Sequence, residues 1–326
     1  MLFGLSDNDA ANNILETPEL ARLRKEYKDK CKISTVATRG DPKHNKNYRN
    51  NPALVISHCE NDKEECKNII IDAGKTFREA AIRWFPDHGI TGLDAIILTH
   101  HHMDAAGGLD DVRGFQKVAA SGTFHKAPTM VPMPLHLSQA CLNDVAQRFP
   151  WLFPKQQPSY RTGTDSNAPA VDRHVASFDI QVFESFKPMD VAGLKIIPLP
   201  VWHGDDLISY GFSFTIHSND GKKKPSHVIY ISDISKMIPE TLEYMMKKYP
   251  HIDILIVDAL LPDKPHSVHF SLDQAIELSQ QLKAKQTFVV GMNCDTFPSH
   301  DETNSTLQKQ HGGKVQLAYD GQVINL

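Results

Sequence analysis

Apolar residues occur along this chain in two patterns, short continuous runs and longer segments in which they recur at helical spacing. A continuous run rich in Ile, Leu and Val is typical of a buried strand, and helical spacing is typical of an amphipathic helix. The two patterns alternate through most of the chain, which predicts an α/β fold. The predicted strands are residues 52–58, 68–71, 94–98, 130–137, 191–199, 209–217, 227–231, 252–257, 287–291 and 315–326.

Helices are predicted before and between these strands. The first covers residues 1 to about 30, where Leu20, Leu23 and Tyr27 recur at helical spacing. The others are residues 77–85, 138–149, 239–249 and 273–282. Two prolines in 130–137 favour an edge strand there. No flexible linker divides the chain, so we expect one domain over residues 31–326, preceded by a helical extension over residues 1–30.

Composition and charge narrow the functional classes. The 326 residues are 40% hydrophobic and 23% charged, which is ordinary for a globular protein with a large core. The formal net charge of -4 argues against a nucleic-acid partner. No apolar run approaches the roughly 20 residues that span a bilayer, and no signal peptide is evident. Five cysteines at irregular spacing fit a reducing compartment better than a disulfide framework, so we expect a cytoplasmic protein.

A polar cluster follows directly on the predicted strand 94–98. It contains three consecutive histidines, of which His100 and His102 can face one point because residues i and i+2 of an extended segment point the same way. Asp104 can reach that point from the next turn. Two imidazoles and a carboxylate suit zinc, iron or manganese. The alternative is a solvated histidine cluster in which Asp104 caps a helix.

The motif Thr-His-x-His-x-Asp after an apolar strand, followed by Gly-Gly-Leu, resembles the signature of the metallo-β-lactamase superfamily. The pattern of that family continues with one more histidine, and this chain has Ala105 there. The resemblance covers most of the chain. It implies a four-layer αββα sandwich with metal ions at one edge, between the two sheets.

The same resemblance assigns roles to residues at the ends of three other predicted strands. Asp72 would support the ligand histidines, His203 would be the third histidine ligand, and Asp233 would bridge two metals. From the residues alone, Asp72 could equally be a turn aspartate, and Asp233 could cap the following helix.

The resemblance thus implies a three-histidine site formed by His100, His102 and His203, with a fourth position for water. Such a site lowers the pKa of water from about 15.7 towards 7 and makes hydroxide available. Asp104 and Asp233 would hold a second ion. We therefore expect one or two ions of Zn²⁺ or Mn²⁺ per chain, with Fe as a further option.

Other residues would act on the substrate or complete the second metal site. The resemblance implies that His269 donates a proton to the leaving oxygen and acts with Asp104 in catalysis, with His266 in reserve. A surface loop with two histidines is the alternative.

Arg113 could bind a substrate phosphate, because a guanidinium matches that group bidentately, or it could lie on an exposed helix face. The histidine that usually follows strand 287–291 in the family is absent. Cys294 or His300 could replace it as a metal ligand.

The motifs together are most similar to those of cyclic-phosphate phosphodiesterases and the related tRNA 3′-processing endonucleases. The resemblance implies that metal-bound hydroxide attacks a small, cyclic or open phosphodiester. A small-molecule substrate is the expected partner; neither nucleic acid nor membrane is expected, and a homodimer is left open. Two alternatives remain. One is a thioesterase of the glyoxalase kind, for which residues 303–314 offer only Lys309 and Lys314 as basic residues, and the other is a non-catalytic scaffold.

Overall fold

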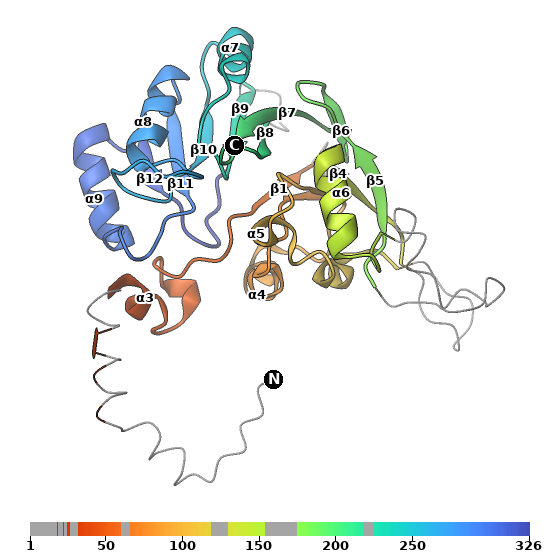
Figure 1. Ribbon diagram of the computed structural model, residues 1–326, viewed down its shortest axis with the longest axis horizontal. Coiled ribbons are helices and arrows are strands. Elements are labelled where there is room, and N and C mark those ends of the chain that lie inside the picture. Colours follow the sequence, from red (N-terminus) through yellow and green to blue (C-terminus); the bar gives the residue numbers. More distant parts are fainter. Residues whose placement is uncertain are drawn as a thin grey trace, which may run out of the picture.

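Figure 1 shows a computed structural model of the chain, in which two β-sheets carry helices on their outer sides. The structure describes residues 32–59, 66–118, 130–153, 175–217 and 224–326, together with Pro18, Arg22, Lys25 and Glu26. These four single residues are helical and exposed. The rest of the predicted helix over residues 1–30, including Leu20, Leu23 and Tyr27, lies outside the described residues.

The first sheet has five strands in the order β1-β2-β3-β4-β5. They are β1 (Leu54–His58), β2 (Lys67–Ile71), β3 (Ala95–Ile97), β4 (Met133–Leu137) and β5 (Phe178–Val182). The β1–β2 pair is antiparallel, and the other pairs are parallel. β4 therefore lies inside the sheet, and the prediction of an edge strand at 130–137 is wrong. β3 pairs with β4 only at Leu135 and His136, so Pro134, which lacks an N–H, lies outside that pairing.

The second sheet has seven strands in the order β12-β11-β10-β9-β8-β7-β6. They are β6 (Met189–Val191), β7 (Leu194–Trp202), β8 (Ile208–Ile216), β9 (Ser226–Ile231), β10 (Ile254–Asp258), β11 (Gln286–Val290) and β12 (Val315–Leu317). β9 to β12 are parallel, and the pairs from β6 to β9 are antiparallel. The last strand is shorter than the predicted 315–326, because the chain turns after Leu317.

Helices connect these strands and cover the sheets. The α-helices are α3 (Lys32–Ala37), α4 (Phe77–Trp84), α5 (Met103–Ala106), α6 (Gln139–Arg148), α7 (Pro239–Lys248), α8 (Leu272–Gln281) and α9 (His300–His311). Three short 3-10 helices are η1 (Pro42–His44), η2 (Pro86–His88) and η3 (Asp111–Phe115). Among the described residues, no helix is long and apolar enough to cross a membrane.

Among the described residues, the buried apolar side chains form three cores, which separate four layers. Ile69 and Ile71 of β2 pack between the two sheets with Tyr230, whereas Ile70 faces outward and packs with Phe77 of α4. A strand places successive side chains on opposite faces, so each central strand serves two cores. Each fully buried aliphatic side chain contributes about 1.5–3 kcal/mol.

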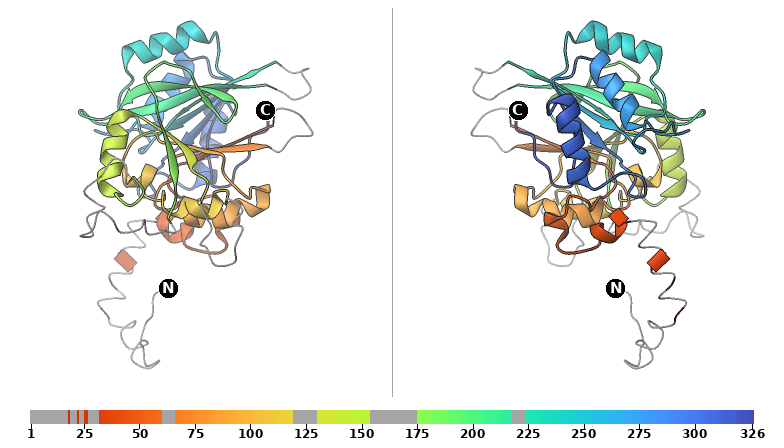
Figure 2. Two further views of the ribbon diagram at one scale, coloured as in Figure 1. Left: turned by 90° about the vertical axis from the view of Figure 1, so that its right-hand side faces the viewer. Right: turned by 90° about the vertical axis from the view of Figure 1, so that its left-hand side faces the viewer.

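The third core lies on the outer face of the second sheet. There Leu255 of β10 packs with Met245 of α7, Ala275 of α8 and Leu307 of α9. Figure 2 shows the strands enclosed between helices above and below. The observed order of layers confirms the expected αββα sandwich.

A disulfide joins Cys59 and Cys66 across the hairpin between β1 and β2. The two cysteines continue the antiparallel register in which His58 faces Lys67, so they lie opposite each other. The expectation of a chain without disulfides is therefore wrong. The irregular spacing of the five cysteines does not indicate a disulfide, but the strand register places Cys59 opposite Cys66.

Candidate metal centre

The carboxyl ends of five strands place the polar residues at one edge of the sandwich. Asp72 follows β2 and the three histidines follow β3, both in the first sheet. His203 follows β7, Asp233 follows β9, and Asp258 ends β10 in the second sheet. Side chains at the carboxyl ends of strands that run in the same direction gather at one edge, which is where α/β sheets commonly bind ligands.

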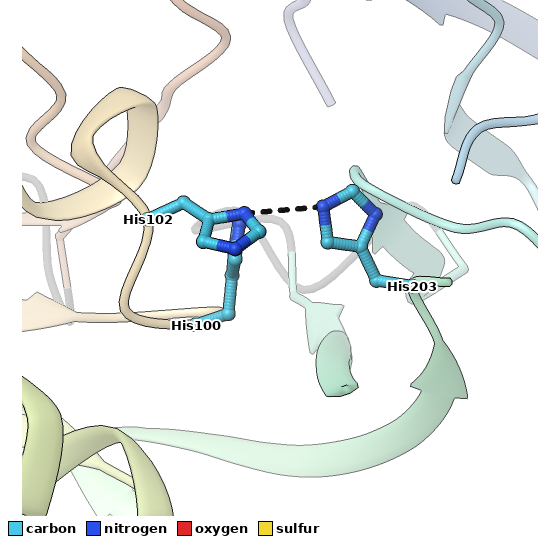
Figure 3. A group of neighbouring side chains, drawn as sticks. All are labelled: His100, His102 and His203. Atoms are coloured by element: carbon cyan, nitrogen blue, oxygen red, sulfur yellow. Dashed lines mark hydrogen bonds between the residues drawn. The ribbon is translucent and has the colours of Figure 1, made fainter. Parts of the chain in front are cut away.

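His100, His102 and His203 come together from the two sheets. The ring centroids of His100 and His102 lie 4.6 Å apart, and that of His203 lies 5.0 Å from His100 and 5.1 Å from His102. Figure 3 shows the three rings turned toward one another. One ligand atom from each lies within 4.8 Å of the other two, so the set can hold a metal ion. His102 also adopts the extended conformation that sequence spacing requires, just before α5 begins.

The hydrogen bonds of His203 leave one lone pair for a metal. Its Nδ1 lies 2.7 Å from the carbonyl oxygen of Val268, which can only accept, so the proton is on Nδ1. The other ring nitrogen, Nε2, then carries the lone pair and lies 3.3 Å from Nδ1 of His102, along the dashed line in Figure 3.

Asp72 and Thr99 orient His100 in the same manner. The Asp72 carboxylate accepts hydrogen bonds from the backbone N–H and the hydroxyl of Thr99, each at 2.9 Å. The Thr99 oxygen lies 2.8 Å from Nδ1 of His100, from which it can accept. This leaves the lone pair on Nε2 of His100, a buried atom without a hydrogen-bond partner. A buried nitrogen in this state fits a metal ligand.

Burial keeps these three imidazoles neutral. It lowers the pKa of His100 well below its usual value, that of His203 to about 4, and that of His102 in the same direction. The neighbouring histidines add to the effect on the pKa of His100. Neutral imidazole is the form that binds metals, so the donor set is ready at neutral pH.

Two carboxylates lie beside the histidines. Asp104 Oδ1 is 3.9 Å from Nε2 of His100, and Asp233 is buried in a left-handed conformation with φ of 54°. Burial and the negative charges of Asp258 and Asp104 raise the pKa of Asp233 to about 7. Asp233 does not cap the next helix, because α7 starts at Pro239 after Ile238.

His269 forms a pair with Asp258 that was not expected from the sequence. Nδ1 of His269 lies 2.7 Å from Oδ2 of the buried Asp258, and 4.0 Å from Oδ1 of Asp233. Burial opposes a charge on His269, but the hydrogen bond to Asp258 and the nearby carboxylates outweigh it and raise the pKa of the ring. Asp258 is the last residue of the apolar strand β10, and this position at a strand end is the signal in the sequence that could have identified it.

Gly291 makes room for this pair. Its φ is 78°, and a Cβ added there would collide with Oδ1 of Asp258. The glycine after β11 therefore lets the backbone pass close to the Asp258 carboxylate.

The other candidates lie at different distances from the histidines. The His266 ring is 5.7 Å from that of His269, and its Nδ1 accepts a hydrogen bond from the backbone N–H of Val268. Arg113 lies in η3, and the carbonyl oxygen of Phe115 in the same helix accepts a hydrogen bond from the backbone N–H of Leu93. Leu93 precedes β3, whereas the histidines follow the opposite end of that strand.

Cys294 and His300 are engaged elsewhere. Cys294 Sγ lies 2.7 Å from the hydroxyl of Ser34, and Nε2 of the buried His300 lies 3.2 Å from the carbonyl oxygen of Leu317. Among the described residues, neither belongs to a group of three side chains that could hold a metal. The structure does not bring them together with Asp104 and Asp233.

Comparisons with known proteins agree with this fold. A family model described as a beta-lactamase superfamily domain matches residues 67–292. A crystal structure of a diphosphatase from the PhnP family is 26% identical, with a TM-score of 0.62 and 89% of each chain covered. The metallo-beta-lactamase fold protein YhfI from Bacillus subtilis is 15% identical, with a TM-score of 0.56, 84% of this chain and 92% of that chain covered.

A curated relative matches the chain over part of its own length. The octanoyltransferase of Porphyromonas gingivalis is 25% identical over 284 residues, which are 87% of this chain and 46% of that protein. The chain thus spans about half the length of this relative. With a family model over more than half of its residues and the αββα sandwich, the chain belongs to the metallo-β-lactamase superfamily and has a metallohydrolase fold.

Proposed function

We propose that the chain is a metal-dependent phosphodiesterase that acts on a small phosphodiester. The observation that carries this proposal is the convergence of three neutral imidazoles, one with a buried and unpartnered nitrogen, beside the Asp258–His269 pair. Metal ligands and a candidate proton donor are the two parts that phosphodiester hydrolysis needs. The similarity to a diphosphatase, at 26% identity over most of both chains, supports phosphate chemistry.

The three histidines fit Zn²⁺ or Mn²⁺, with Fe as a further option. An ion held there would supply Lewis acidity and an attacking hydroxide near neutral pH. The chain contributes the orientation of the donors. Val268 and Thr99 accept the Nδ1 protons of His203 and His100, and so present Nε2 in each ring.

The His269 ring is the proposed proton donor for the leaving oxygen. Its Nδ1 is held by Asp258, so Nε2 is the nitrogen that can exchange a proton with a substrate. Because the pKa of His269 is raised, a larger fraction of the rings carries a proton near neutral pH, which favours donation to the leaving oxygen. Asp104 and Asp233 would orient the reacting groups by their charge, and His266 is the reserve donor.

A panel of substrates tests this proposal. Purified protein is supplied with Mn²⁺ or Zn²⁺ and assayed on bis(p-nitrophenyl) phosphate, p-nitrophenyl phosphate and a glutathione thioester. We expect turnover of the diester in preference to the monoester and the thioester. Preference for the thioester would replace the proposal with the glyoxalase-type reaction, and turnover of none would favour the scaffold.

A further inference from the structure

We propose that the chain holds one tightly bound metal ion, on His100, His102 and His203, and lacks a second tight site beside it. The sequence left one or two ions per chain as the expectation, and the side chains that the structure brings together fit one. This inference rests on the metal centre of the proposed function. It concerns how many ions the site holds and not which ester it cleaves.

The two groups of side chains that could hold a metal ion share one donor, the Nε2 lone pair of His203. Within the described residues, the groups of three are His100, His102 and His203, and His203, Asp233 and His269. Because Nδ1 of His203 donates to Val268, only Nε2 can bind a metal. This nitrogen lies 3.3 Å from Nδ1 of His102. An ion on the first group therefore takes His203 away from the second.

The remaining donors make a poor second site. Without His203, the second group consists of Asp233 and His269. Nδ1 of His269 is bonded to Asp258, so this ring can offer a metal only its Nε2. That nitrogen and the Asp233 carboxylate are two donors, fewer than the four of a usual zinc site. Asp104 is the one further carboxylate among the expected ligands, and its side chain is 39% exposed to solvent.

The residues that could have restored the lost imidazoles do not reach this position. Ala105, at the place of a ligand histidine in the family, offers no donor and is buried. Cys294 contacts Ser34 of α3, and His300 is held at the start of α9 by Leu317. Two carboxylates without a full set of partners bind an ion more weakly than three converging imidazoles do.

Metal stoichiometry tests the inference without reference to activity. Metal-free protein is titrated with Zn²⁺ and separately with Mn²⁺, freed of excess ion by gel filtration, and analysed by mass spectrometry. We expect about one ion per chain for the natural protein, about one for His269→Gln and Asp104→Asn, and almost none for His102→Ala. Circular dichroism establishes that each variant is folded, and an unfolded one is replaced by the corresponding Ala or Glu substitution.

Two ions per natural chain, falling to one in His269→Gln or Asp104→Asn, would overturn the inference and make these residues ligands of a second ion. The result is separable from the proposed function. One ion without diester turnover would reject the phosphodiesterase and keep the inference, whereas two ions with turnover would do the opposite.

Discussion

At the scale of single residues, the candidate centre depends on groups that set the protonation state of a neighbour. Thr99, Asp72 and Val268 decide which ring nitrogen of a histidine carries its proton, and Asp258 does so for His269. Such partners tune a ligand without touching the ion themselves, and removing one usually costs about 10–100-fold in affinity or activity.

His269→Ala separates proton donation from metal binding. If the ring donates a proton to the leaving oxygen, turnover of a diester falls by about 10²–10⁴-fold because general acid catalysis is lost. Metal content stays at the level of the natural protein. A variant that loses its metal would show that His269 is a ligand and that the proposed role is wrong.

Asp258→Asn tests the pair from the other side. The Asp258 carboxylate can only accept a hydrogen bond from Nδ1 of His269, whereas the neutral amide of Asn can also donate to that nitrogen. The variant therefore no longer fixes the proton on Nδ1 and no longer stabilises the positive charge of the ring. We expect kcat to fall by about 10–100-fold with KM nearly unchanged. Asp258→Glu, which keeps the charge, should recover part of the loss. Equal kcat in the Asp258→Asn variant and the natural protein would contradict the positioning role.

The lowered pKa of His203 predicts a pH dependence in metal-free protein. Its pKa is about 4 in the folded state and about 6.5 when unfolded, so the unfolded state binds more protons between these values. Stability from neutral His203 is therefore complete above about pH 6.5 and is lost as pH falls toward 4.

Comparison of Tm between natural protein and His203→Gln, both with chelator, isolates this effect from the other titrating groups. As the pH falls from 7 to 5, we expect the Tm of the natural protein to fall further than the Tm of His203→Gln. A difference that does not change with pH would show that His203 titrates normally.

His100, His102 and Asp104 form a compact motif after an apolar strand and could be picked out from the sequence. His203 and Asp233 follow strands of their own, but their roles were implied by the family resemblance. Asp258 also lies at the end of an apolar strand, but nothing in the sequence indicates that His269 is its hydrogen-bond partner. The positions of Cys294 and His300 depend on how α3 and the C-terminal residues pack, which local sequence does not determine.

At the scale of elements, continuous apolar runs identified the central strands, because parallel strands buried on both faces have no polar side. β5 was not expected. It is an edge strand whose residues alternate between Phe178, Ile180 and Val182 and polar neighbours, and most of it is half-buried or exposed. β4 was predicted as an edge strand because of Pro132 and Pro134, but Pro132 precedes the strand and Pro134 lies outside the residues that pair with β3.

The hairpin of β1 and β2 makes a prediction about stability. The disulfide lies at the opposite end of β2 from Asp72, so it can affect the fold without disturbing the centre. Replacing Cys59 and Cys66 by Ser should lower the free energy of unfolding by about 2–3 kcal/mol, since a short loop is no longer closed in the unfolded chain.

Urea denaturation of this double variant measures the change, with Cys141→Ser as the comparison for loss of a cysteine that forms no disulfide. Diester turnover should match that of the natural protein. A stability equal to that of the natural protein would mean that the disulfide does not constrain the chain.

At the scale of the whole molecule, the centre joins the two sheets. His100 and His102 come from the loop after β3, and His203 comes from the end of β7 in the other sheet. The sandwich and its site edge could be predicted because the motif resembled a known family. That His203 faces His100 and His102 across the two sheets was implied by the resemblance alone, since such contacts depend on three-dimensional packing.

The most direct test of metal-dependent diester hydrolysis is the rate at which bis(p-nitrophenyl) phosphate is cleaved by His102→Ala and by His101→Ala, measured beside natural protein before and after chelation. His101 is the matched control, because its Nδ1 lies 3.7 Å from Asp144 on α6 and it belongs to neither metal-binding group. We predict that chelation and His102→Ala each remove turnover, that added Mn²⁺ or Zn²⁺ restores it only in the chelated natural protein, and that His101→Ala stays near the natural rate. Undiminished turnover by His102→Ala, or by chelated protein, would contradict the account.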